Sequence, residues 1–205
     1  MPGKLFFELD EDKRRRISDA ALREFAAYGY GNSSTNRIVR TCGISKGSLF
    51  LYFANKEDLY FYILDTVTAE LAAESESWTG SISEELFARI SDYSAAEISW
   101  YIRNPEKGRL LVRAFSDSSD AIGARTAERY GPAGEDIYRR LMDGADCGSL
   151  RHDKDKAADI VKWVLAGFNA GFMKDACLGE MSFEKLKDDY LRKLSVYIGI
   201  LRDCL

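Results

Sequence analysis

Residues 34–53, near the start of the chain, read Ser-Thr-Asn-Arg-Ile-Val-Arg-Thr-Cys-Gly-Ile-Ser-Lys-Gly-Ser-Leu-Phe-Leu-Tyr-Phe. Two short helices that meet at Gly43 are typical of a helix-turn-helix, and glycine permits the positive φ that a sharp turn between helices often needs. The apolar side chains are spaced to face one small core: Ile38, Val39, Ile44, Leu49 and Phe53. Small and hydroxyl residues on the other face of the second helix would let it lie close in a DNA major groove.

Outward from this stretch, helical patterns continue in both directions. Apolar residues recur at helical spacing over 13–28, and Asn55 is placed to cap a helix that runs to about residue 75. Further helices are expected over about 83–103, 106–115, 121–142, 154–178 and 183–203. We therefore predict an all-α protein of about nine helices.

Charge is distributed unevenly along the chain. The net charge of the 205 residues is −4, but nine basic and only two acidic residues lie between Lys13 and Lys56. The excess is smaller when residues 1–60 are counted, yet the remainder of the chain is clearly acidic. A basic N-terminal module that could meet nucleic acid, joined to an acidic remainder, is the expectation. The alternative is a solvated helix face with chance clustering.

Several classes of site are excluded by composition. His152 is the only histidine, and the four cysteines are far apart without a Cys-x-x-Cys pair, so neither a zinc site nor any other metal or cofactor site is expected. No catalytic residues are assigned. The run at residues 5–7 is too short for a signal peptide, and no apolar stretch is long enough for a membrane span. We expect a cytoplasmic protein with no membrane partner.

The region from Ala20 to Leu64 resembles the DNA-binding domain of the TetR family of bacterial transcriptional regulators. The residues that carry the resemblance are Ala21-Leu22-Arg23-Glu24-Phe25-Ala26, Gly29-Tyr30, Ile38, Gly43-Ile44-Ser45-Lys46-Gly47-Ser48-Leu49-Phe50, Tyr52-Phe53 and Asn55-Lys56-Glu57-Asp58-Leu59. The resemblance covers roughly a fifth of the chain. Leu51 departs from it, because many members have a polar or aromatic residue there.

The resemblance implies two helical domains. Residues 1–58 would form a three-helix DNA-binding domain, and residues 59–205 a helical domain for ligand binding and dimerisation. Operator DNA would be contacted by residues of the second and third helices and just beyond them: Thr35, Ser45, Lys46, Gly47, Ser48, Phe50, Tyr52 and Lys56. Core packing is the alternative for Phe50 and Tyr52, a purely capping role for Ser45, and a solvated side chain for Lys56.

The last two predicted helices are candidates for the interface of a homodimer. Gly167 and Gly171 make one side of the first helix small, and Tyr190, Leu194 and Tyr197 form an apolar stripe on the second. Two such helices from each subunit would make a four-helix interface. The alternative is that these residues pack within one chain.

Aromatic residues and one carboxylate are candidates for a small-molecule effector pocket. They are Tyr93, Glu97, Trp100, Phe115, Tyr138 and Trp163. Glu97 follows Tyr93 by four residues and precedes Tyr101 by four, so the three share a helix face, and a carboxylate there could recognise a cationic group. The alternatives are core packing for the aromatic residues and a surface position for Glu97.

These observations favour a dimeric, ligand-responsive transcriptional regulator, most simply a repressor that leaves a near-palindromic operator when a small molecule binds. One alternative is a helical-bundle binding protein or enzyme, without operator binding, that uses His152 or Glu97 as a base. Another is a helical interaction protein that has lost DNA binding, for which Leu51 is the only indication.

Overall fold

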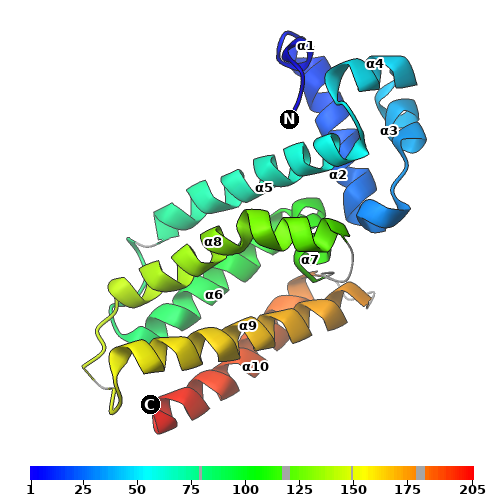
Figure 1. Ribbon diagram of the computed structural model, residues 1–205. Coiled ribbons are helices and arrows are strands. Elements are labelled where there is room, and N and C mark those ends of the chain that lie inside the picture. The colour runs from blue at the N-terminus through cyan, green and yellow to red at the C-terminus, as the bar shows by residue number, and fades with distance from the viewer. Residues whose placement is uncertain (79, 117–120, 149, 179–182) are drawn as a thin grey trace. The chain divides into compact units, whose positions relative to one another are not determined.

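The computed structural model describes residues 1–78, 80–116, 121–148, 150–178 and 183–205, without the side chains of 116, 133, 135, 136, 173–178, 183 and 184. Within these ranges the chain forms ten α-helices and one isolated bridge, between Glu85 and Asp146 (Figure 1). The all-α prediction is confirmed. The additional helix is α1 (Lys4–Phe7), which is too short for its apolar spacing to predict a helix.

Contacts divide the chain into two compact units. The first comprises Met1–Ala72 with Asn104–Ala114, and the second comprises Ala73–Arg103 with Phe115–Leu205. The helix α5 (Lys56–Trp78) continues without interruption past residue 58, where the sequence predicted a boundary between functions. That boundary stays a prediction, since no change of secondary structure marks it.

The first unit is built from α1, α2 (Glu11–Asn32), α3 (Thr35–Cys42), α4 (Lys46–Tyr52), most of α5, and most of α7 (Pro105–Ser116). Local signals define its helix ends. Gly43 ends α3 with φ 71°, the Ser45 hydroxyl accepts the backbone N–H of Ser48 at 3.0 Å, and the Asn55 side chain accepts that of Asp58 at 2.8 Å. Gly29, with φ 67°, interrupts α2 near its end. The turn and the caps therefore follow the sequence prediction.

The core of the first unit is aromatic and includes the helix that the sequence did not predict. Phe6 of α1 is fully buried, with ring centroids 4.8 Å from Phe53 and 5.1 Å from Tyr62. The backbone N–H of Gly3 also donates to the carbonyl of Tyr52 at 2.7 Å. These contacts hold α1 against α4 and fix the end of α4.

The second unit contains α6 (Leu86–Arg103), α8 (Ala121–Asp143), α9 (Lys154–Leu178) and α10 (Phe183–Cys204). In Figure 1, α9 and α10 run side by side, and α10 makes its most extensive contact with α6. Their facing apolar side chains form one core, which includes Phe87, Ile90, Leu165, Leu194 and Ile198. Because of this packing, one face of α6 points toward the interior of the second unit.

Candidate functional site

The helix α4 presents two different faces. Leu49 is buried in the first unit, whereas Ser45, Lys46 and Gly47 are exposed, and Ser48 is half-buried. The outward face continues with Phe50, 40% exposed, and Leu51, 65% exposed. The structure thus brings together five of the predicted DNA-contact residues, and core packing is not the role of Phe50.

The polar groups on this face differ in how far they are engaged within the protein. The hydroxyl oxygens of Ser45 and Ser48 lie 2.9 Å apart and share a hydrogen bond. Lys46 makes no hydrogen bond or ion pair with any residue that the structure describes. Its ammonium group is therefore available to a phosphate, which carries the opposite charge.

A partly buried ion pair orients the helix that precedes α4. The Glu24 carboxylate, which is buried, accepts the backbone N–H of Ser34 at 2.7 Å and a bidentate contact from Arg37, at 2.8 Å to Nε and 2.5 Å to Nη2. This hydrogen bond raises the pKa of Arg37. Glu24 thereby joins α2 to the first turn of α3. Sequence reasoning missed the pair, because its members are 13 residues apart on different helices.

Two predicted DNA-contact residues serve the interior. Tyr52 is only 8% exposed and packs beside Phe6, which agrees with the alternative of core packing. The ammonium group of Lys56 donates to the carbonyls of Tyr30 at 2.7 Å and Ser33 at 3.2 Å, and burial lowers its pKa. Lys56 therefore holds the end of α2, and its role as an operator contact stays a prediction. The remaining candidate, Thr35, is half-buried at the start of α3.

In the second unit, the charge of Glu97 acts on three tyrosines, and Tyr138 acts on two of these. Burial raises the pKa of Glu97 to about 7, and no other cause contributes. Burial, and after it the negative charge of Glu97, raises the pKa of Tyr93, Tyr101 and Tyr190. Tyr138 has the same smaller effect on the pKa of Tyr93 and of Tyr190. We call these five residues the Glu97 cluster.

Hydrogen bonds hold two of these tyrosines in place. The hydroxyl of Tyr190, on α10, donates to Oδ1 of Asn169, on α9, at 2.7 Å. Tyr93 has a side-chain hydrogen bond with Ser75 and packs edge-on against Trp78. Sequence reasoning assigned Tyr93, Glu97 and Tyr138 to this site. It missed Tyr190, which joins only when α10 packs on α6.

Three further candidates for the effector pocket lie elsewhere. Trp163 is 66% exposed, and Phe115 is 50% exposed with its ring against Tyr130, so neither lines an interior site. Trp100 is buried, with its ring edge-on to that of Tyr101. The assignments of Phe115 and Trp163 are corrected, because helical spacing shows which residues share a face but not which face turns inward.

Of the five residues predicted for the dimer interface, two are buried and three are exposed. Tyr190 and Leu194 are buried in the core of their own chain, so their assignment to a dimer interface was wrong. Gly167, Gly171 and Tyr197 are exposed, and a Cβ atom built on either glycine would meet nothing within 4 Å. Further exposed apolar residues of α9 and α10 are Ile160, Trp163, Val196 and Ile200.

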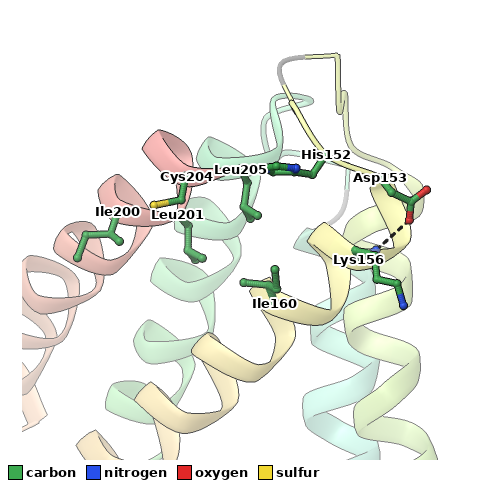
Figure 2. Close-up of a pocket in the computed structure, with 8 residues that line it drawn as sticks. All are labelled: His152, Asp153, Lys156, Ile160, Ile200, Leu201, Cys204 and Leu205. Atoms are coloured by element: carbon green, nitrogen blue, oxygen red, sulfur yellow. Dashed lines mark hydrogen bonds between the residues drawn. The ribbon is translucent and has the colours of Figure 1, made fainter.

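A pocket of about 600 Å³ lies where the start of α9 meets the end of α10 (Figure 2). Ile160, Ile200, Leu201 and Leu205 give it a largely apolar lining, and His152 and Lys156 lie at one side. None of the predicted effector residues lines it. Because Ile160 and Ile200 also belong to the exposed apolar surface, the pocket is a hollow in that surface.

Neither a metal-binding cluster nor a membrane-spanning helix is found in the part of the chain that the structure describes. It holds no group of three or more His, Cys, Asp or Glu side chains able to bind a metal ion. His152 is exposed and adjoins the apolar pocket. Within the same described ranges, no helix has the length and apolar character needed to cross a membrane.

Residues 17–63 match the protein family described as "Bacterial regulatory proteins, tetR family". The HTH-type transcriptional repressor AcnR of Corynebacterium diphtheriae is 33% identical over 159 residues, covering 76% of this chain and 78% of that protein. The HTH-type transcriptional repressor Rv1474c of Mycobacterium tuberculosis is 30% identical over 125 residues. That match covers 57% of this chain and 64% of the relative, slightly under two thirds of its length.

A solved structure resembles the whole chain. A TetR family transcriptional regulator from Chloroflexus aurantiacus superposes with a TM-score of 0.66 at 24% identity. The superposition covers 99% of this chain and 97% of that one. The likeness extends the shared fold beyond the helix-turn-helix to the second unit.

Proposed function

Because this chain belongs to the TetR family of bacterial regulatory proteins, we propose that it binds a near-palindromic operator as a homodimer and leaves it when a small molecule binds the second unit. The outward face of α4 carries the proposal. Its inward residue, Leu49, is buried, while Lys46, Gly47 and Leu51 point away from the core and are free to meet base edges and phosphates. Two relatives named as repressors favour repression as the direction of control.

Exposed apolar side chains on α9 and α10 support dimerisation. Trp163, Val196, Tyr197 and Ile200 are large apolar side chains that α9 and α10 leave exposed. Contiguous patches of such side chains mark interaction sites. Gly167 and Gly171 leave room for a close approach by another helix. A dimer formed through this face would have two-fold symmetry, so its two α4 helices would be related by that symmetry. The two half-sites that they contact would then form an inverted repeat in the DNA.

The proposed activity requires no catalysis. Within the described residues no cluster of acids, histidines and cysteines could hold a metal ion, and two relatives are named as transcriptional repressors. We infer that the protein acts by binding alone, in the cytoplasm, where its DNA target lies.

Selection from random duplex DNA tests the proposal. Purified full-length protein should enrich an inverted repeat, bind it with two chains per duplex, and lose affinity steeply as salt rises. Lys46→Ala should weaken binding to the enriched duplex and make it less sensitive to salt. Lys185→Ala, at an exposed position of α10, should leave the affinity and its salt dependence unchanged. Failure to enrich any sequence, or equal binding by Lys46→Ala, would count against operator recognition through α4.

A further inference from the structure

A second positively charged side chain lies at the end of α4 that is opposite Lys46. The ammonium nitrogen of Lys13, on α2, is 6.0 Å from the centre of the Tyr52 ring, within the range over which a ring attracts a cation. Lys46 is the first residue of α4 and Tyr52 is the last. The helix α4 is therefore flanked by one ammonium group at each end.

The short helix α1 determines where Lys13 lies. It packs against α4, where the backbone N–H of Gly3 donates to the carbonyl of Tyr52 at 2.7 Å and the buried ring of Phe6 lies 6.1 Å from that of Tyr52 (Figure 1). The chain then enters α2, whose first turn is capped by Asp10, a carboxylate that accepts the backbone N–H of Lys13 at 2.8 Å. The backbone of Lys13 is thereby held close to α4 before any ligand binds.

Lys13 also differs from most of the cations near it, because it has no partner within the described protein. Three neighbouring cations are each engaged by an acidic side chain or a carbonyl group: Lys4 by Glu8 at 3.6 Å, Arg15 by Asp12 at 2.9 Å, and Arg14 by the carbonyl of Phe7 at 3.4 Å. Lys13 makes no ion pair with any described residue, and neither does Arg16, which is exposed one turn further along the same face of α2. This face of α2 thus carries two charges that are available to an anion.

The length of α4 is close to the width of the DNA major groove. Its seven residues, at about 1.5 Å each, extend over about 10 Å, and the groove is about 12 Å wide between its two phosphate backbones. A helix of this length that lies across the groove brings its two ends to opposite strands. Of the two predicted operator contacts at or just beyond the end of α4, Tyr52 is buried and the ammonium group of Lys56 donates to two carbonyls. Lys13 is the cation that stays available there.

We propose that Lys13 is a DNA contact outside the helix-turn-helix, which binds a phosphate of one strand while Lys46 binds a phosphate of the other, across the groove that α4 enters. Phosphate contacts fix the register and orientation of a protein on the duplex and carry no sequence information themselves. The pair therefore sets how α4 lies in the groove, while its other side chains meet the bases. This inference rests on the proposed function, since operator DNA is the ligand, and it gives a role to a segment that precedes the family match at residues 17–63.

Replacement of single phosphates tests for this contact. Each phosphate of the selected duplex is replaced in turn by a methylphosphonate, which is uncharged, and fluorescence anisotropy measures the affinity of the full-length protein. Several replacements in each half-site should weaken binding of the native protein. At one of these positions, Lys13→Gln should bind the replaced and unreplaced duplexes equally, because its contact is already lost. A position on the opposite strand, across the major groove, should behave in the same way with Lys46→Gln.

Matched variants separate a local contact from an effect of net charge. Lys13→Gln should weaken binding to selected and unrelated duplexes alike, by about three- to tenfold, and should reduce its salt dependence. Arg15→Gln removes the same charge from the same helix, but Arg15 is paired with Asp12, so the affinity should change by less than about twofold. Lys13→Arg keeps the charge and should retain most of the affinity, and circular dichroism checks that all three variants fold.

The possible outcomes keep this inference separate from the proposed function. If the native protein binds selectively but no phosphate position responds to Lys13→Gln, or if Arg15→Gln has an equal effect, the inference is overturned and operator recognition by α4 is intact. Binding without sequence preference that Lys13→Gln still weakens supports the phosphate contact and contradicts operator recognition. A native protein that binds no duplex overturns both.

Discussion

The outward face of α4 and the inward face of α6 each carry a charged side chain without a partner, but one lies in solvent and the other is shielded from it. Lys46 on α4 lies in solvent and has no partner within the described protein, so its charge is available and costs the fold little. Glu97 on α6 is shielded by protein, and no described residue forms an ion pair with it, so ionisation of its carboxyl group destabilises the folded state. The two faces therefore differ in what an unpartnered charge costs the folded state: little at Lys46, and part of the folding free energy at Glu97.

The difference has a consequence for mutagenesis. Changes at the exposed positions of α4, such as Lys46 and Gly47, should alter binding without altering folding, because these residues lie in solvent in the free protein. Changes around Glu97 should alter stability even when no ligand is present.

Gly47→Glu should reduce affinity for the selected duplex at least a hundredfold. Gly47 is exposed, and a Cβ atom there would meet only the Ser45 hydroxyl, at 3.8 Å, so the new side chain fits the free protein. Against DNA it would occupy the space between helix and bases and would add negative charge near phosphates. Fluorescence anisotropy measures the affinity, and thermal unfolding should show a midpoint close to that of the native protein.

The same substitution at Gly131, which is exposed on α8 and has no atom near its Cβ position, is the control and should leave DNA binding unchanged. A native-like affinity for Gly47→Glu would mean that α4 does not lie against the DNA.

Glu97→Gln should stabilise the protein at high pH and do little at low pH. The pKa of Glu97 rises from 4.5 to about 7 on folding, so the folded state holds this proton more tightly than the unfolded state. The penalty is absent below the unfolded pKa, grows between about pH 4.5 and 7, and is full above that range. A shift of this size corresponds to a difference on the order of 3 kcal/mol at pH 8, and less than half of that at pH 5.

Urea unfolding of both proteins across this range measures the difference. The tyrosines on which the charge of Glu97 acts do not titrate within this range, because the pKa values of Tyr93 and Tyr101 of α6 and of Tyr190 of α10 are all raised above their usual value. A difference in stability that stays constant from pH 5 to 8 would contradict the buried position of Glu97.

Lys56→Met and Lys46→Met should have opposite consequences. Losing the Lys56 ammonium leaves the carbonyls of Tyr30 and Ser33 without its hydrogen bonds and removes a cation 4.3 Å from the Tyr30 ring. We expect Lys56→Met to lower the free energy of unfolding by about 1–2 kcal/mol and to leave the salt dependence of DNA binding unchanged. Lys46→Met should instead preserve stability and reduce that salt dependence.

Denaturant unfolding and salt titrations on both variants make the comparison. If Lys56→Met changed the salt dependence as much as Lys46→Met, Lys56 would be a phosphate contact, as the sequence alone predicted.

Features set by neighbouring residues were predictable from the sequence. The turn at Gly43 and the caps at Ser45 and Asn55 depend on atoms within a few residues, so their chemistry is visible in the sequence. The shared face of Tyr93 and Glu97 is predictable for the same reason, since it depends only on helical spacing.

Features set by packing between helices were not predictable. Apolar residues occur on both sides of α10, and only its contact with α6 decides that Tyr190 and Leu194 turn inward while Tyr197 stays exposed. In the same way, Lys56 reaches carbonyls that are 23 and 26 residues away in sequence. The Glu97 cluster gained Tyr190 through such packing, and no spacing rule relates residues on helices so far apart.

The smallest expected effect concerns Leu51, an apolar residue on a face otherwise suited to polar contacts. At 65% exposure it contributes little to the core, and the groove feature that an aliphatic side chain complements is the 5-methyl group of thymine. Replacing thymines of the selected duplex by uracil, one at a time, removes only that methyl group. One position in each half-site should then lose affinity a few-fold with the native protein and not with Leu51→Ala, while polar contacts through Lys46 are unaffected. Equal sensitivity of both proteins to every replacement would show that Leu51 touches no thymine methyl, and recognition by α4 would then depend on its polar residues and Phe50 alone.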